Sequence, residues 1–328
     1  MTPLHLSVAE ERFPVAGAFT IARGSRTEIR VVTATLSDGV FAGRGECVPY
    51  PRYGETVEGV AALIDSLAPD LAEGLDRLAL QARLPPGAAR NALDCAFWDL
   101  EAKQTRTSVW RLAGLAAPRP AVTAFTISLG APEAMRAKAA ENADRPLLKI
   151  KLGGDGDLDR IRAVRAGAPS ASLIVDANEG WTLAQYQARA PEPTRLGVAL
   201  IEQPLPASAD AALATIARPL PICADESCHD VKTLAALRGK YDAVNVKLDK
   251  AGGLTEALRL KRQAEAEGFR IMVGCMLGTS LAMAPAFLLT GGADFVDLDG
   301  PLLLAKDREP PILYDGSTMF PAQPELWG

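Results

Sequence analysis

Short apolar runs recur through the second half of this chain, and most of them end in charged or polar residues. The runs are LLKIKL (147–152), LIVDAN (173–178), ALIEQP (199–204), ICADES (222–227), AVNVKL (243–248), IMVGCM (271–276) and FVDLDG (295–300). Lys151, Asp176, Glu202, Asp225 and Lys247 follow one another at intervals of 22 to 26 residues. That interval fits one strand, one helix and two loops. Repeated parallel units of this kind close into a barrel whose chemistry lies at the carboxyl ends of the strands, so the pattern predicts a TIM-type α/β barrel.

The first third of the chain has a different pattern. Alternation in TEIRVVTATL (27–36), between a predicted polar loop ARGSR (22–26) and an SDG turn (37–39), indicates antiparallel strands. Helical patterns follow at 57–73 and 86–103, and strands followed by helices are typical of a compact α+β unit. We therefore expect an α+β capping domain at 1–117, completed by the tail at 305–328, and a barrel at 118–304 that begins with AVTAFTISL (121–129). A barrel this short is expected to lack its final helix.

Composition excludes several classes of protein. The net charge is −5, from 35 basic and 40 acidic residues interspersed along the chain, so nothing favours nucleic acid or an anionic membrane as a partner. Residues 271–293 carry no charge, but their glycines and proline indicate a strand, a loop and a buried helix rather than a membrane span. The N-terminus has no pattern of a secretory signal. Five cysteines without disulfide or metal spacing indicate free thiols in a reducing compartment, which predicts a cytoplasmic protein.

Two lysines share one face of the KIK segment. Strand alternation directs Lys149 and Lys151 to one side and Ile150 to the other. A solvated edge strand is the alternative, but the flanking leucines suit a strand that helices cover. Two neighbouring ammonium groups are expected to lower each other's pKa, which a general base at neutral pH requires.

Three acids follow three consecutive apolar strands. A single acid at such a position is commonly a helix cap, but Asp176, Glu202 and Asp225 together concentrate negative charge that needs a cation. Single carboxylate oxygens are ligands that suit Mg²⁺. Asn178 shares the face of Asp176 and is a candidate donor to substrate. Glu226 is expected to point elsewhere and to pair with a lysine.

Lys247 lies four units after Lys151, so the two lysines are expected to face each other across the barrel axis. One base could then remove a proton from a carbon while the other returns it on the opposite side. Asp297 and Asp299 alternate in the DLDG segment, where a simple turn is the alternative to a pair of carboxylates that binds a substrate ammonium.

Histidines and arginines complete the candidate residues. Arg23 and Arg26, in the loop of the covering domain, could close over the mouth and bind an anion, although surface arginine is the default. His5 and His229 are interpreted as structural.

KIK, DANEGW, IEQP, ADES and NVKLDKAGG together resemble the enolase superfamily, in its muconate-lactonizing subgroup, over nearly the whole chain. The DLDG segment narrows the resemblance to dipeptide epimerases that act on alanyl-glutamate. The resemblance implies a modified (β/α)7β barrel with an N-terminal capping domain and one Mg²⁺ per subunit. It assigns Lys151 and Lys247 as acid–base pair, Asp176, Glu202 and Asp225 as metal ligands, and Lys149, Asp297, Asp299, Thr126, Arg23, Cys275 and Leu277 as substrate contacts. Counting back from the GEC segment favours Arg23 over Arg26.

The resemblance also implies a reaction. Removal of the proton next to a carboxylate adds charge to that carboxylate, and Mg²⁺ stabilises the resulting enediolate. The expected result is 1,1-proton transfer at the C-terminal residue of a dipeptide, from L-Ala-D-Glu to L-Ala-L-Glu, in murein peptide metabolism. Other dipeptides, cycloisomerisation, an o-succinylbenzoate-type dehydration and a non-catalytic metal-binding protein remain alternatives. A homo-oligomer stays open.

Overall fold

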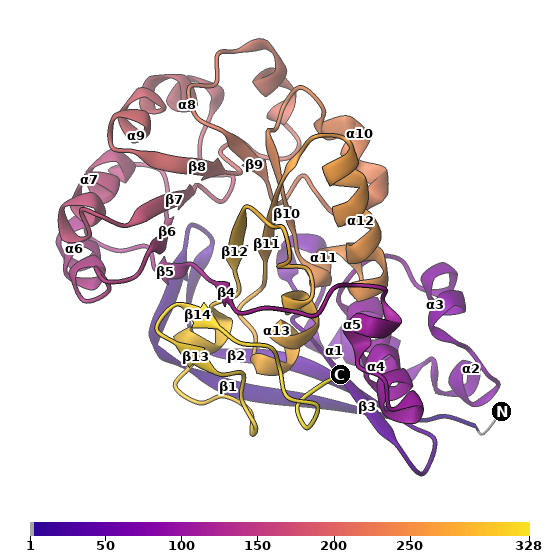
Figure 1. Ribbon diagram of the computed structural model, residues 1–328. Helices are drawn as coiled ribbons and strands as arrows, with labels where there is room; N and C mark the ends of the chain where they lie inside the picture. The colour runs from indigo at the N-terminus through magenta and orange to yellow at the C-terminus, as the bar shows by residue number, and fades with distance from the viewer. Residues whose placement is uncertain (1–2) are drawn as a thin grey trace.

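The computed structural model describes residues 3–328 and contains a parallel barrel beside a smaller α+β cap (Figure 1). Eight strands follow one another around the barrel in chain order. They are β5 (Phe125–Ile127), β6 (Leu147–Lys151), β7 (Ser172–Asp176), β8 (Val198–Glu202), β9 (Ile222–Ala224), β10 (Ala243–Val246), β11 (Arg270–Gly274) and β12 (Phe295–Asp297). The ring closes between its first and last strands, where Ala124 N donates to Val296 O at 2.8 Å. The predicted barrel is confirmed.

Helices surround the barrel on its outer side (Figure 1). They are α6 (Pro132–Ala140), α7 (Asp157–Gly167), α8 (Leu183–Arg189), α9 (Pro191–Arg195), α10 (Leu234–Leu237), α11 (Leu248–Ala251), α12 (Leu254–Ala266) and α13 (Ser280–Phe287), with the 3-10 turns η2 (Asp210–Thr215) and η3 (Val231–Thr233). After β12 the described chain has the 3-10 turn η4 (Gly300–Leu303) and no further α-helix, so the expected absence of the final barrel helix is confirmed. Within residues 3–328, no helix combines the length and the apolar character that crossing a bilayer requires. The uncharged stretch 271–293 is indeed strand, loop and fully buried helix.

The cap is an antiparallel sheet covered by helices. Its strands are β1 (His5–Ile21), β2 (Gly24–Ser37) and β3 (Ala42–Cys47), and its helices are α1 (Val57–Asp65), α2 (Ala68–Ala72), α3 (Arg77–Arg83), α4 (Ala88–Thr105) and α5 (Val109–Leu112), with the 3-10 turn η1 (Pro51–Tyr53). Strand β3 packs closely on α4 because Gly43 and Gly45 have no Cβ, and a Cβ there would lie within 2.3 Å of helix backbone atoms. The predicted loop at 22–26 is wrong. Pairing continues to Ile21 and Gly24, so only Ala22 and Arg23 form the turn.

The C-terminal tail joins both parts of the molecule. In a separate sheet of three strands, β13 (Tyr314–Asp315) of the tail pairs with β14 (Thr318–Met319), and β14 pairs with β4 (Ala121–Val122). The expected first barrel strand at 121–129 is therefore split, because β4 pairs with the tail and only β5 joins the barrel. Arg308 of the tail contacts Glu46 of the cap at 2.7 Å.

Inward-facing side chains of the barrel change character along each strand. At the amino ends they form an apolar layer of Ala124, Leu147, Ile174, Leu200, Cys223, Ala243, Met272 and Phe295. Two residues later on the same strands lie Thr126, Lys149, Asp176, Glu202, Asp225, Asn245, Gly274 and Asp297. Because strand side chains alternate with a period of two, both sets face the barrel interior, and the second set builds the site.

Candidate active site

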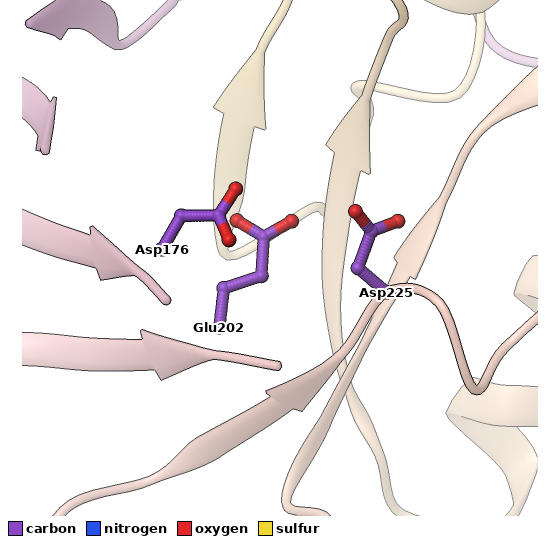
Figure 2. Close-up of side chains that lie close together, drawn as sticks. All are labelled: Asp176, Glu202 and Asp225. Atoms are coloured by element: carbon purple, nitrogen blue, oxygen red, sulfur yellow. The ribbon is translucent and has the colours of Figure 1, made fainter. Parts of the chain in front are cut away.

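Three carboxylates meet at the carboxyl ends of β7, β8 and β9. Asp176, Glu202 and Asp225 are buried, and one oxygen from each lies within 4.8 Å of the others. Figure 2 shows the three carboxylates turned towards one another from neighbouring strands. The predicted acidic cluster is therefore one site rather than three separate helix caps.

Each of these carboxylates has one oxygen held by a donor from the protein. The contacts are Asn178 N to Asp176 Oδ1 (2.9 Å), Asn245 Nδ2 to Glu202 Oε1 (2.7 Å) and Lys250 Nζ to Asp225 Oδ1 (2.6 Å). Asn245 fits beside Glu202 only because residue 274 is glycine, since a Cβ there would lie 2.4 Å from Asn245 Oδ1. The orientation of each carboxylate is thus fixed by its surroundings.

The second oxygen of each carboxylate faces a lysine. The pairs are Lys151 Nζ with Asp176 Oδ2 (2.7 Å), Lys149 Nζ with Glu202 Oε2 (2.6 Å) and Lys247 Nζ with Asp225 Oδ2 (2.8 Å). The Lys149 contact is close but lies outside hydrogen-bonding angles, so Glu202 Oε2 is a buried acceptor without a hydrogen bond among the described residues. Three converging anionic oxygens, one of them unsatisfied, fit a small divalent cation with oxygen ligands.

Charge in the site raises the pKa values of Lys149 and Lys247 instead of lowering them. Burial alone would lower the pKa of Lys149, but the carboxylates of Asp297, Glu202 and Asp176 outweigh burial and raise it well above its ordinary value. Burial likewise raises the pKa of Asp176, yet Lys151 and Lys149 bring it down to about 2. The prediction that the two lysines lower each other's pKa is therefore wrong for Lys149, because nearby carboxylates dominate the local potential.

Lys151 and Lys247 line the same cavity beneath the cap. Their side chains keep only 10% and 7% of their surface exposed. Each donates to a different carboxylate of the acidic cluster, Lys151 to Asp176 and Lys247 to Asp225. A substrate atom held between them would meet two amines, one from the end of β6 and one from the residue that follows β10.

Both arginines of the β1–β2 hairpin also line this cavity. Arg23 reaches the barrel, where its Nη2 contacts Glu226 Oε1 at 2.9 Å and its Nη1 donates to Asn178 O at 3.1 Å. The expectation that Glu226 pairs with a lysine and points elsewhere is wrong, because this hairpin of the cap supplies the cation. Arg26 lies over the Tyr50 ring at 5.8 Å and has no ion pair within residues 3–328.

Asp297 and Asp299 lie beside Lys149 and Thr126 and are not among the residues that line the shared cavity. Lys149 Nζ donates to Asp297 Oδ2 at 2.7 Å, and Thr126 N donates to Asp299 Oδ2 at 2.6 Å. Burial and the charge of Asp297 raise the pKa of Asp299 to about 7. Strand β12 ends at Asp297, so Asp299 reaches the site from the following turn.

The loop after β11 contributes Cys275 and Leu277 to the shared cavity. Cys275 Sγ donates to Asp297 O at 3.3 Å. All five cysteines are free, as expected. His229 packs edge-on against Tyr53 of the cap, with ring centroids 4.9 Å apart, consistent with a structural residue.

Sequence reasoning missed Lys250, whose ammonium group is completely buried against Asp225. In NVKLDKAGG the second lysine follows the strand and has the pattern of a solvated helix start. Its position three residues after Lys247 was the available signal, because residues three apart lie on one side of a helical turn.

Two family models match most of the chain. Residues 4–114 match the N-terminal domain of mandelate racemase / muconate lactonizing enzyme, and residues 134–324 match the enolase C-terminal domain-like family. The L-Ala-D/L-Glu epimerase of Escherichia coli K12 is 50% identical over 94% of this chain and 97% of its own length. The N-acetyl-D-glutamate racemase of a Pseudoalteromonas species is 43% identical over 91% and 95%.

Solved structures agree with these relatives. An Agrobacterium tumefaciens enolase family member with homology to dipeptide epimerases, with bound sodium and L-Ala-L-Glu, is 58% identical, has a TM-score of 0.98 and covers 99% of this chain and 100% of its own. A dipeptide epimerase of Methylococcus capsulatus, complexed with Mg and L-Arg-D-Lys, is 29% identical, has a TM-score of 0.90 and covers 98% of both chains. The fold, the acidic site and these matches lead to one conclusion: the chain belongs to the enolase superfamily, in the mandelate racemase / muconate lactonizing enzyme family.

Proposed function

We propose that this protein is a dipeptide epimerase that inverts the α-carbon of the C-terminal residue of L-Ala-D/L-Glu. The observation that carries the proposal is the pair Lys151 and Lys247, which line one cavity and each contact a different carboxylate of the acidic site. The relative from E. coli, half of whose aligned residues are identical, supports both the reaction and the substrate.

Asp176, Glu202 and Asp225 would hold Mg²⁺ through the oxygens that face Lys151, Lys149 and Lys247, namely Asp176 Oδ2, Glu202 Oε2 and Asp225 Oδ2. The related M. capsulatus structure with Mg and a dipeptide supports this ion. When bound, Mg²⁺ supplies positive charge that stabilises negative charge developing on the substrate carboxylate.

The two cavity lysines move the proton. In one direction neutral Lys151 takes the α-proton onto Nζ while the Lys247 ammonium delivers one to the opposite face, and in the other direction their roles exchange. The buried Lys149 ammonium adds a further positive charge where the substrate carboxylate becomes more negative. The side chains of both bases are almost enclosed, which limits proton exchange with bulk water during turnover.

Different groups would bind the two ends of the dipeptide, one set beside Lys149 in the barrel and the other in the cap. Asp297 and Asp299 would accept the free ammonium, beside Thr126 and the backbone of the 275–277 loop. Two buried carboxylates, one with an oxygen that has no hydrogen bond among the described residues, support recognition of a cation there.

The glutamate side chain needs a cation in the cap. The sequence favours Arg23, but Glu226 already neutralises Arg23, whereas Arg26 has no carboxylate partner within residues 3–328. Arg26 is therefore the arginine that we assign to the substrate side-chain carboxylate, and Arg23 anchors the hairpin on the barrel.

The proposed roles divide the chain into a cap at 1–117, completed by 305–328, and a catalytic barrel at 118–304. The five free thiols support a cytoplasmic location. We place the reaction after hydrolysis of murein peptides, which supplies alanyl-glutamate.

Racemisation of N-acetylglutamate is the second candidate, because a relative that is 43% identical is named for it. The two functions differ in their need for a free ammonium. The test measures kcat/KM of the Mg²⁺-loaded enzyme for L-Ala-L-Glu and N-acetyl-L-glutamate by chiral chromatography. We expect the dipeptide to be preferred, and no epimerisation of any dipeptide would reject the proposal.

A further inference from the structure

We infer that Lys250 makes Asp225 a ligand through one oxygen and thereby sets a preference of the acidic site for Mg²⁺ over the larger Ca²⁺. The inference rests on the proposed function in one respect, namely that Asp225 binds the ion. Lys250 is a positioning residue, because it acts through Asp225 and has no contact with the shared cavity.

All the donors of Lys250 are used inside the barrel. Its Nζ donates to Asp225 Oδ1 at 2.6 Å, to Asp225 O at 2.5 Å and to Asn245 O at 3.0 Å. An ammonium has three donors, and this side chain has no exposed surface. A buried charge with every donor satisfied gives its partner one defined orientation.

The local chain brings Lys250 to this place. A tight turn follows β10, in which the amides of Lys250 and Ala251 both donate to Lys247 O. The turn therefore puts the ammonium groups of Lys247 and Lys250 on either side of Asp225, which they approach at Oδ2 and Oδ1.

The backbone of Asp225 is also fixed. Its amide donates to Gln203 Oε1 at 2.9 Å, and the same oxygen accepts from Ser227 N at 3.1 Å. With this backbone fixed, rotation of the carboxylate decides which oxygens it offers to an ion, and Lys250 restrains that rotation by holding Oδ1 while Lys247 contacts Oδ2.

Asp225 differs from the other two carboxylates in the charge of its donor. The oxygens of Asp176 and Glu202 that do not face Lys151 or Lys149 are held by a neutral backbone amide and a neutral side-chain amide, whereas Asp225 Oδ1 is held by an ammonium. Charge-assisted hydrogen bonds are about twice as strong as neutral ones. Lys250 is therefore the strongest of the three restraints on ligand geometry.

Mg²⁺ and Ca²⁺ differ in how many oxygens of one carboxylate they bind. Mg²⁺ takes near-octahedral geometry and usually one oxygen from each carboxylate, whereas Ca²⁺ accepts more ligands and often binds both oxygens of one carboxylate. A site in which Lys250 withholds Asp225 Oδ1 favours Mg²⁺. Without Lys250, Asp225 can offer both oxygens.

Titration calorimetry of the metal-free enzyme with MgCl₂ and with CaCl₂, without substrate, tests the inference. For Lys250→Met we expect the Kd for Mg²⁺ to rise about 10- to 100-fold and the Kd for Ca²⁺ to change less than about threefold. A loss of Mg²⁺ and Ca²⁺ affinity by the same factor, or no loss, would overturn it, because a merely structural lysine would not separate the ions.

Lys261→Met is the matched control. Lys261 Nζ also contacts one carboxylate, Glu265 Oε1 at 2.6 Å, and one carbonyl, Gly291 O at 2.9 Å, but lies in α12 outside the site. Both dissociation constants should stay unchanged in this variant.

The unaltered enzyme provides a second measurement if Lys250→Met does not fold. In a crystal structure with Mg²⁺, we expect Asp225 to bind the ion through Oδ2 alone while Oδ1 stays on Lys250. Binding through both oxygens overturns the inference. Since neither experiment contains a dipeptide, an enzyme that shows the expected metal selectivity but epimerises nothing would reject the proposed function and leave this inference standing.

Discussion

The two ends of the barrel use the same strands for different purposes. At the amino ends, residues such as Leu147, Ile174 and Leu200 form a continuous apolar layer. About 7 Å further along each strand, the inward positions hold lysines, carboxylates and amides that are equally buried. The amino end gains stability from apolar contact, and the carboxyl end holds charges that burial disfavours.

The comparison shows how the mouth tolerates those charges. Each carboxylate of the acidic site has one oxygen on a fixed donor and the other beside an ammonium. A buried charge is expensive unless it is paired and hydrogen-bonded. Substitutions only two residues apart are therefore expected to differ in effect. Those among the paired charges at the carboxyl ends of the strands should change activity, and those in the apolar layer at the amino ends should change stability.

The largest effect is expected at the mouth, on activity. Lys151→Ala and Lys247→Ala should each lower kcat for epimerisation about 100- to 10,000-fold, because one acid–base partner is lost. Each variant should keep exchange of the α-proton for only one of the two epimers, measured by proton NMR in deuterated water. Full activity of either variant would contradict the roles of the two bases.

The next largest effect is expected on stability, in the apolar layer at the amino ends of the barrel strands. Leu200→Ala should lower the free energy of unfolding by about 2–5 kcal/mol, because it leaves a cavity in the apolar layer. The kcat of the folded enzyme should change little, although Glu202 is two residues away. Urea unfolding and kcat, measured on one preparation, check this. A large loss of kcat with unchanged stability would contradict the proposed difference between the two ends of the barrel.

A smaller effect is expected where the cap covers the mouth. Arg26→Ala should lower kcat/KM for L-Ala-L-Glu. The loss should correspond to about 1.5–3 kcal/mol of transition-state stabilisation, the range for a hydrogen bond to a charged group. A dipeptide with a neutral C-terminal side chain is the control and should lose little. If Arg23→Ala shows this selectivity and Arg26→Ala does not, the assignment of the two arginines is reversed.

The smallest effect concerns Asp249, a polar residue at the mouth without a proposed part in the chemistry. It joins barrel to cap by accepting from Val48 N at 3.0 Å and Asn91 Nδ2 at 2.9 Å. Burial raises its pKa from 3.8 to about 7. The folded protein therefore keeps this proton up to a higher pH than the unfolded chain does. The stability that results is lost as pH rises from about 4 through 7.

Asp249→Asn should remove that loss. The free energy of unfolding of this variant should be almost equal to that of the unaltered protein at pH 4 and about 1–2 kcal/mol higher at pH 8. Thermal unfolding of both proteins at the two pH values measures the difference. An advantage that is the same at both values would show that ionisation of Asp249 has no part in it.

The sequence is sufficient to predict the barrel and most of its mouth because both depend on periodicity. Parallel strands of one barrel end at one rim, so a polar residue at each strand end implies a shared site. That reasoning correctly brings Asp176, Glu202 and Asp225 together and directs Lys151 and Lys247 into one cavity. The roles of these residues in a reaction stay predictions.

What the sequence could not predict depends on distances between segments far apart in the chain. Glu226 pairs with Arg23, 203 positions earlier in the chain, because the tip of the cap hairpin reaches the barrel. The raised pKa of Lys149 results from carboxylates on several strands, which no local pattern reveals. The split of the expected strand at 121–129 follows from pairing with the C-terminal tail.

The most direct test of the central claim follows the α-protons of L-Ala-L-Glu by NMR, with enzyme and Mg²⁺ in deuterated water. Transfer between two amines on opposite faces predicts that the glutamate α-proton disappears as the D-Glu epimer forms, while the alanine α-proton persists. Retention of the glutamate signal after long incubation, for this and every other dipeptide offered, would contradict the account.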